Sequence, residues 1–203
     1  MKVKICGLTR KEDMILANRY VPDYIGFVFY PQSKRAVSLE QAYTLKSLLH
    51  RQISAVGVFV NEDVEKIREI CRLGIVDMIQ LHGDEDELYI HRLKALINKP
   101  IIKAVRVRSR EQILDAEKLP CEYLLLDTYT SNTMGGSGTV FDHSLIPILH
   151  KPYFLAGGID VFNMREAVKE CAPFAVDISS GCEVMGYKDA EKMEQLITLG
   201  KTL

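Results

Sequence analysis

Several features that would point to a specialised class of protein are missing from this sequence. Lys plus Arg total 26 and Asp plus Glu total 27, so the formal net charge is −1. No global basic field is present to attract nucleic acid or an anionic membrane surface. No apolar run approaches the roughly 18 residues that a membrane span needs, and the N-terminal MKVKICGLTRKED lacks the apolar stretch of a secretory signal. We therefore expect no nucleic-acid partner, no membrane partner and no exported form.

Cysteine is sparse, odd in number and scattered, at Cys6, Cys71, Cys121, Cys171 and Cys182. No two cysteines form a C-x-x-C pair, so the spacing favours neither a zinc site nor a disulfide framework. A reducing cytoplasm is the simplest compartment for such a chain. His82 has no second histidine at ligand spacing, so we expect no metal.

The chain instead contains short apolar runs that recur along its whole length. Most are apolar throughout rather than alternating, which is typical of parallel strands covered on both faces. Hydrophobic residues make up 47% of the 203 residues, enough for one large core, and we expect one domain spanning residues 1–203. The predicted strands are Val3–Cys6, Tyr24–Phe29, Ala55–Val60, Val76–Leu81, Ile101–Val105, Tyr123–Leu126, Tyr153–Ala156 and Phe174–Ile178.

Amphipathic helical stretches lie between these runs. They centre on the apolar positions of Leu39–Leu49, with Ser38 as N-cap, then of Val64–Cys71, Leu88–Ile97, Met164–Cys171 and Ala190–Leu199. Eight strands alternating with helices predict an α/β fold, a single-domain (β/α)8 TIM barrel. A doubly wound open sheet is the alternative.

Active sites of such barrels lie at the C-terminal ends of the strands. Two proton-transfer groups fall there. Cys6 ends the first run, in KICG, and Asp127 ends the sixth, in YLLLD. A buried cysteine usually serves only packing, as we expect for Cys71 and Cys171, but a thiolate can act as a base if its pKa is lowered. Asp127 alone could equally cap its loop.

Other strand ends carry groups suited to a small anionic molecule. Arg35, in a polar loop, can grip a carboxylate through two parallel hydrogen bonds. His82 follows the fourth run. The glycine turns LAGGID and DISSGCE follow the seventh and eighth runs, where barrels often bind phosphate with backbone N–H groups. Asp177 is expected to point into the barrel in a structural or supporting role. The irregular stretch 128–139, with its glycines, is long enough to be functional.

These segments resemble the phosphoribosylanthranilate isomerase family of tryptophan biosynthesis, in order and over nearly the whole chain. The chain departs from the family pattern at Thr139, His143, Cys182 and Met185, none of which is a proposed acid or base. The matching segments are KICGLTR at Lys4–Arg10, GFVFYPQSKRAVS at Gly26–Ser38, VGVFVNE at Val56–Glu62, IQLHGDE at Ile79–Glu85, LLLDT at Leu124–Thr128, GGSGTVFD at Gly135–Asp142, LAGGI at Leu155–Ile159 and VDISSGCE at Val176–Glu183.

The resemblance implies an Amadori rearrangement of N-(5-phosphoribosyl)anthranilate to 1-(2-carboxyphenylamino)-1-deoxyribulose 5-phosphate. It gives the role of general base to Cys6, of general acid to Asp127 and of carboxylate binding to Arg35. No cofactor or metal is required, and the chain would act as a monomer or homodimer. The further substrate-binding residues expected are Gln80, His82, Gly136, Gly138, Gly157, Gly158, Asp177, Ser179, Ser180 and Gly181.

Two other interpretations stay open at this stage. The related isomerase of histidine biosynthesis acts on a substrate with two phosphates and carries aspartate at the first strand end. A second phosphate would need a second cradle, but only Asp84 and Glu85 follow LQLHG. A non-enzymatic binder of phosphorylated metabolites would keep the glycine turns without needing both Cys6 and Asp127.

Overall fold

Eight parallel strands close into a barrel in the computed structural model, which describes residues 1–128 and 141–203. Each strand pairs with its neighbours in sequence order, and β8 returns to pair with β1, so the predicted closed barrel is confirmed and the open sheet is wrong. The strands are β1 (Lys2–Cys6), β2 (Tyr24–Val28), β3 (Ser54–Phe59), β4 (Met78–Leu81), β5 (Ile101–Val107), β6 (Tyr123–Thr128), β7 (Tyr153–Leu155) and β8 (Ala175–Ile178).

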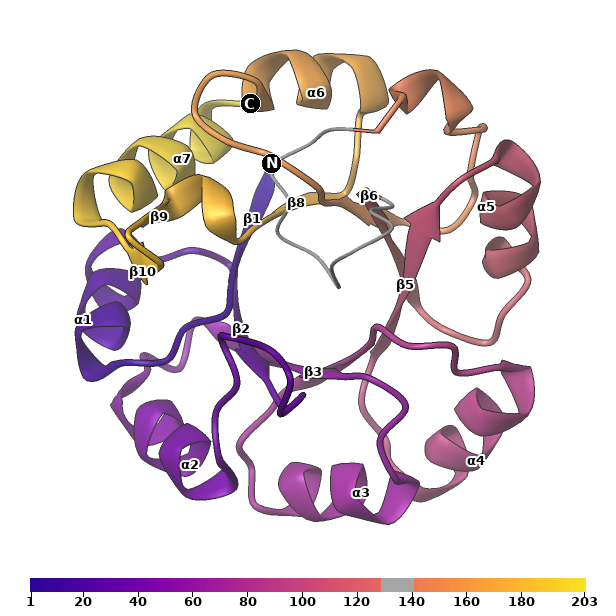
Figure 1. Cartoon of the computed structure of the whole chain (residues 1–203), viewed down its shortest axis with the longest axis horizontal. Coiled ribbons are helices and arrows are strands. Elements are labelled where there is room, and N and C mark those ends of the chain that lie inside the picture. Colours follow the sequence, from indigo (N-terminus) through magenta and orange to yellow (C-terminus); the bar gives the residue numbers. More distant parts are fainter. Residues whose placement is uncertain (129–140) are drawn as a thin grey trace.

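Helices form a ring around the strands (Figure 1). They are α1 (Lys11–Tyr20), α2 (Leu39–Leu48), α3 (Val64–Arg72), α4 (Glu87–Leu96), α5 (Arg110–Glu117), α6 (Met164–Cys171) and α7 (Ala190–Thr202). Between β6 and β7, the described residues hold only the short 3-10 helix η1 (His143–Leu145). A second 3-10 helix, η2 (Ser180–Cys182), follows β8 and leads into a hairpin of β9 (Glu183–Val184) and β10 (Tyr187–Lys188).

The helix starts follow from local side-chain chemistry. Ser38 accepts a hydrogen bond from the Gln41 N–H, as expected of an N-cap. At α1 the Asp13 carboxylate accepts from the N–H groups of Thr9 and Arg10. Both α1 and α5 escaped the sequence analysis, because each buries few residues and α5 buries only Ile113 and Ala116.

Two separate layers make up the core. The larger lies between the strands and the helices. The smaller fills the inside of the barrel and includes Val56, Met78, Ile102 and Leu125. At one end of this interior, Phe154 packs its ring against Tyr24, Tyr123 and Phe174, with ring centroids 5.5–5.7 Å apart. These aromatic rings close the bottom of the barrel, so the polar interior residues are left near the opposite end.

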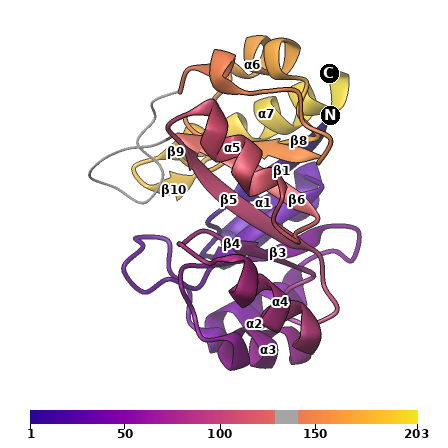
Figure 2. The same ribbon diagram turned by 90° about the vertical axis from the view of Figure 1, so that its right-hand side faces the viewer.

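Both chain ends lie away from the β9–β10 hairpin, as the side view shows (Figure 2). The hairpin, which follows the last strand, therefore marks the end of the barrel where the strands finish. No helix in the described parts of the chain combines the length and apolar character needed to cross a bilayer.

The interior aromatic cluster should be a main source of stability. Phe154 is fully buried, so Phe154→Ala should lower the free energy of unfolding by about 3–5 kcal/mol through lost burial and a residual cavity. The matched control is Phe162→Ala, because Phe162 is 90% exposed and its loss should change stability by less than about 0.5 kcal/mol. Urea denaturation measures both. Equal losses in the two variants would contradict this description of the core.

Candidate active site

One pocket at the strand ends contains all the expected site residues that lie within the described chain. Cys6 reaches it from β1, Asp127 from β6 and Arg35 from the loop after β2. The same pocket is lined by Gln80, His82, Gly157, Gly158, Asp177, Ser179, Ser180 and Gly181. The expected residues Gly136 and Gly138 lie outside the described residues.

Cys6 occupies a space that a neighbouring glycine leaves open. Cys6 pairs in register with Gly26 of β2, and a Cβ built on Gly26 would lie 2.6 Å from the Cys6 Sγ. Any larger residue at position 26 must therefore displace the thiol. Burial raises the pKa of the Cys6 thiol above its ordinary value, while the Lys4 ammonium beside it lowers that pKa. Burial is the larger of the two effects.

Asp127 belongs to a hydrogen-bonded group of three side chains. The other two are Gln80 of β4 and His82, the residue that directly follows β4. Its Oδ2 is 3.3 Å from the His82 Nε2, and its Oδ1 accepts from the Thr128 N–H. The Gln80 Nε2 lies 2.8 Å from the His82 Nδ1. With the amide donating to Nδ1, the imidazole hydrogen is on Nε2 and faces Asp127. The buried Gln80 Oε1 has no partner among the described residues.

Arg35 is held by an acidic residue far away in the sequence. Its Nε and Nη2 each lie 2.7 Å from one carboxylate oxygen of Glu183, and these hydrogen bonds raise the pKa of the guanidinium. Glu183 also accepts from Lys188, whose ammonium donates to the Ser179 carbonyl. The pair with Glu183 leaves the Arg35 Nη1 edge as the part available to a ligand carboxylate.

The opposite side of the pocket is built from backbone. Gly157 and Gly158 have φ values of 86° and 68°, and a Cβ on Gly181 would lie 2.0 Å from the Ile159 carbonyl oxygen. At these three glycines the turns after β7 and β8 therefore have no room for a side chain or a backbone conformation that disfavours one, so the backbone itself lines the pocket there.

Apolar lining of the pocket was missed by the sequence analysis. Val28, Val58 and Val60 line the pocket together with Tyr30 and Ser33. Val28 and Val58 lie opposite each other on the paired strands β2 and β3. Side chains alternate between the two faces of each strand, so the sequence shows which positions point into the barrel. It does not show which of these valines line the pocket, because a valine in the buried core gives the same pattern.

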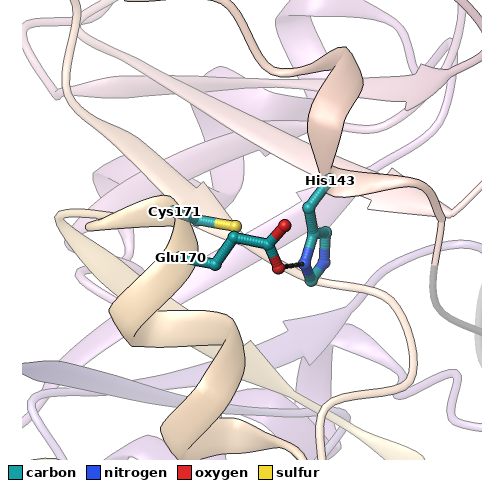
Figure 3. Close-up of side chains that lie close together, drawn as sticks. All are labelled: His143, Glu170 and Cys171. Atoms are coloured by element: carbon teal, nitrogen blue, oxygen red, sulfur yellow. Dashed lines mark hydrogen bonds and ion pairs between the residues drawn. The ribbon is translucent and has the colours of Figure 1, made fainter.

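Three side chains of metal-binding type gather elsewhere, where η1 packs on α6. The His143 Nδ1 lies 3.2 Å from the Glu170 Oε2, and the Cys171 thiol is close by (Figure 3). His143 is the first residue of η1, and its side chain is only 8% exposed. Its Nε2 is buried without a partner among the described residues, but it faces away from Glu170 (Figure 3). The hydrogen bond between His143 and Glu170 explains this cluster as a contact that holds η1 against the helix.

Comparison with known proteins identifies the family. The family described as N-(5'-phosphoribosyl)anthranilate isomerase matches residues 3–198. The chain belongs to this family. It is 44% identical over 210 residues to the N-(5'-phosphoribosyl)anthranilate isomerase of Lachnoclostridium phytofermentans, covering 97% of this chain and 96% of that protein. The resemblance stated from the motifs is thus confirmed, and the chain is an isomerase of tryptophan biosynthesis.

Solved structures of the family share the whole fold. The phosphoribosylanthranilate isomerase of Thermotoga maritima superposes with a TM-score of 0.89 at 36% identity, covering 100% of both chains; that organism's enzyme is dimeric. A second isomerase structure, at 33% identity, a TM-score of 0.84 and 100% coverage of both chains, holds reduced 1-(o-carboxyphenylamino)-1-deoxyribulose 5-phosphate.

The space beside the Cys6 thiol gives a direct test of the site geometry. Gly26→Ala should lower kcat by about 10²-fold, because displacing a reacting group by an ångström costs about that much. The matched control is Gly200→Ala, whose Cβ would crowd Val3 from the helix side of β1, at 2.2 Å. Steady-state kinetics and thermal melting should show that the control loses stability but keeps kcat. If Gly26→Ala keeps wild-type kcat, the thiol position is not critical.

Proposed function

We propose that this chain converts N-(5'-phosphoribosyl)anthranilate to 1-(2-carboxyphenylamino)-1-deoxyribulose 5-phosphate, with Asp127 as general acid and Cys6 as general base. The observation that supports this most strongly is the meeting of Cys6, Asp127, Arg35 and the two glycine turns in one pocket. Family membership supports the reaction, and the pocket supports the assignment of roles within it. We further propose that residues 1–203 act as one barrel domain.

The substrate has two anionic groups and an aromatic ring between them, and the pocket offers matching surfaces. We assign the phosphate to the backbone N–H groups of the turns at Gly157–Gly158 and Ser179–Gly181. We assign the anthranilate carboxylate to the Arg35 guanidinium and the ring to the valines of β2 and β3. A relative binds the reduced product, which carries the same carboxylate and phosphate groups.

The reaction then needs two proton transfers. Asp127, protonated, donates its proton to the ribose ring oxygen as the C1–O bond breaks, which leaves an iminium ion. Cys6, as thiolate, removes the proton from C2, and the C2–H electrons form the C1–C2 double bond of an enolamine. The enolamine tautomerises to the ketone. Each such transfer by a positioned group contributes roughly 10²–10⁴-fold in rate, and no electrons leave the substrate.

His82 and Gln80 suit supporting roles around the acid. The His82 Nε2–H group faces one Asp127 oxygen, which restricts the rotation of the carboxyl group. The Gln80 Oε1 is a buried acceptor without a partner in the described parts of the chain, and a buried acceptor is unfavourable unless a donor reaches it. A hydroxyl group of the substrate ribose is a donor of the right kind.

The two-phosphate substrate of the histidine-pathway isomerase fits this chain less well. The backbone N–H groups of Asn61 and Gly83 could have formed a cradle after β3 and β4, but they donate to the Glu85 carboxylate. The Glu85 carboxylate is 1% exposed and pairs with the Lys103 ammonium. A fixed anion therefore occupies these donors, which disfavours a second phosphate there.

We also propose a compartment and an oligomeric state for this chain. All five cysteines are free, which suits a reducing compartment, and we propose the cytoplasm. The dimeric relative favours a homodimer over a monomer. We expect no nucleic-acid partner, given the net charge of −1.

A turnover assay tests the proposed function. Incubation with phosphoribosylanthranilate should remove its anthranilate fluorescence, and Cys6→Ala should lower kcat by roughly 10²–10⁴-fold with little change in KM. Cys71→Ala is the matched control, since it removes a buried thiol that packs against the helix layer. No turnover by the wild-type protein would contradict the function. Wild-type kcat in Cys6→Ala would remove Cys6 from the mechanism.

The acid is tested by Asp127→Asn, which keeps the shape of the side chain but cannot supply an acidic proton. The kcat should fall by roughly 10²–10⁴-fold, while the melting temperature changes little. Asp127 also accepts from the Thr128 N–H, so a purely structural role is the alternative. A steep loss of melting temperature with retained kcat in the folded fraction would show that Asp127 is a loop cap.

A further inference from the structure

A lysine inside the barrel has no role in the proposed mechanism. Lys4 precedes Cys6 by two residues on β1, so both side chains lie on the same face of the strand. Lys4 is 0% exposed, and its Nζ lies 2.9 Å from both carboxylate oxygens of Asp177. Asp177 is its register partner on β8. A fully buried ammonium is costly unless it is paired, which raises the question of what this pair does.

Because Lys4 and Cys6 share one face of β1, the Lys4 ammonium is placed to act on the thiol as well as on Asp177. Burial alone lowers the pKa of Lys4, but attraction to Asp177 and to Cys6 raises it above its usual value. Lys4 therefore stays charged at neutral pH. Its positive charge in turn lowers the pKa of the Cys6 thiol, against the opposing effect of burial.

The other charges near the thiol are less able to stabilise a thiolate. Arg35 and Lys188 also lie close enough to act on it, but both pair with the Glu183 carboxylate. Asp177 acts in the opposite direction and raises the pKa of the thiol. Unlike Arg35 and Lys188, Lys4 comes from the same strand face as Cys6, so the fold of β1 itself sets the ammonium beside the sulfur.

We propose that Lys4 is a positioning residue of the isomerase: its buried ammonium orients Cys6 and stabilises the thiolate, while Asp177 keeps that ammonium charged and in place. This inference rests on the proposed function, in which Cys6 is the base. When the sulfur takes the C2 proton, the negative charge beside Lys4 disappears, and Lys4 keeps its own proton throughout.

A purely structural role is the alternative, because the same ion pair joins the first and last strands. Thiol alkylation separates the two roles without needing turnover. Iodoacetamide reacts with the thiolate, forming an S–C bond and releasing iodide, so the rate at Cys6 against pH reports the thiolate population. Peptide mass mapping distinguishes Cys6 from the other four cysteines.

Lys4→Met should slow alkylation of Cys6 at pH 8 by about tenfold or more, since each unit of pKa is a factor of ten in thiolate. Asp177→Asn should speed it, because the asparagine oxygen can still accept from the Lys4 ammonium and hold it in place, whereas the anion that opposes the thiolate is gone. The matched control is Lys103→Met, which removes a buried ammonium on β5 from its Glu85 partner. It should lower stability and leave the alkylation profile of Cys6 unchanged.

The proposal requires that Lys4→Met and Asp177→Asn change the alkylation rate of Cys6 in opposite directions. If Lys4→Met and Asp177→Asn change the alkylation rate in the same direction, or if Lys4→Met leaves the profile unchanged, the proposal is overturned. Should Lys4→Met fail to fold, Lys4→Met with Asp177→Leu removes both charges and leaves no unpaired ion, and slow alkylation is again expected. Full activity in Cys6→Ala would refute the proposed base, whereas an unchanged alkylation profile in an enzyme that needs Cys6 would refute only the role of Lys4.

Discussion

The ion pair between Lys4 and Asp177 lies where the barrel closes, and the rest of the site depends on that closure. β1 and β8 pair in the register that sets these two residues side by side. The same register brings the turn after β8 beside Cys6, where the Ser179 hydroxyl donates to the Cys6 carbonyl oxygen. A shift of one residue would turn Lys4 and Cys6 away from the interior.

Two cationic side chains, Arg35 and Lys188, pair with one carboxylate, that of Glu183. These two ion pairs link the loop after β2 to the hairpin after β8. The protein therefore needs no net positive potential to hold a substrate with two anionic groups. One anionic group can meet a preoriented guanidinium and the other can meet backbone N–H groups, and both kinds of donor are in place before the substrate arrives.

Sequence patterns predicted the strands well because the interior and exterior faces of a barrel are both covered, so most strands are largely apolar. They failed where burial is slight, as at α1 and α5. Their positions at strand ends pointed to Cys6 and Asp127, and the structure brings both into one pocket. They could not reveal that Arg35 would meet Glu183, which lies 148 residues away. Lys4 also escaped notice, since KICG draws attention to the cysteine and nothing in the sequence shows that Lys4 meets Asp177.

The most direct test of the central claim is a crystal structure of this protein with the reduced product, 1-(o-carboxyphenylamino)-1-deoxyribulose 5-phosphate. In that complex we expect the phosphate on the N–H groups of Gly157–Gly158 and Ser179–Gly181, and the carboxylate on Arg35. We also expect the Cys6 sulfur within contact distance of C2, and the Asp127 carboxyl group near the oxygen that was the ring oxygen of the substrate ribose. A phosphate bound beside His82 and Gly83, or a C2 atom out of reach of Cys6, would contradict it.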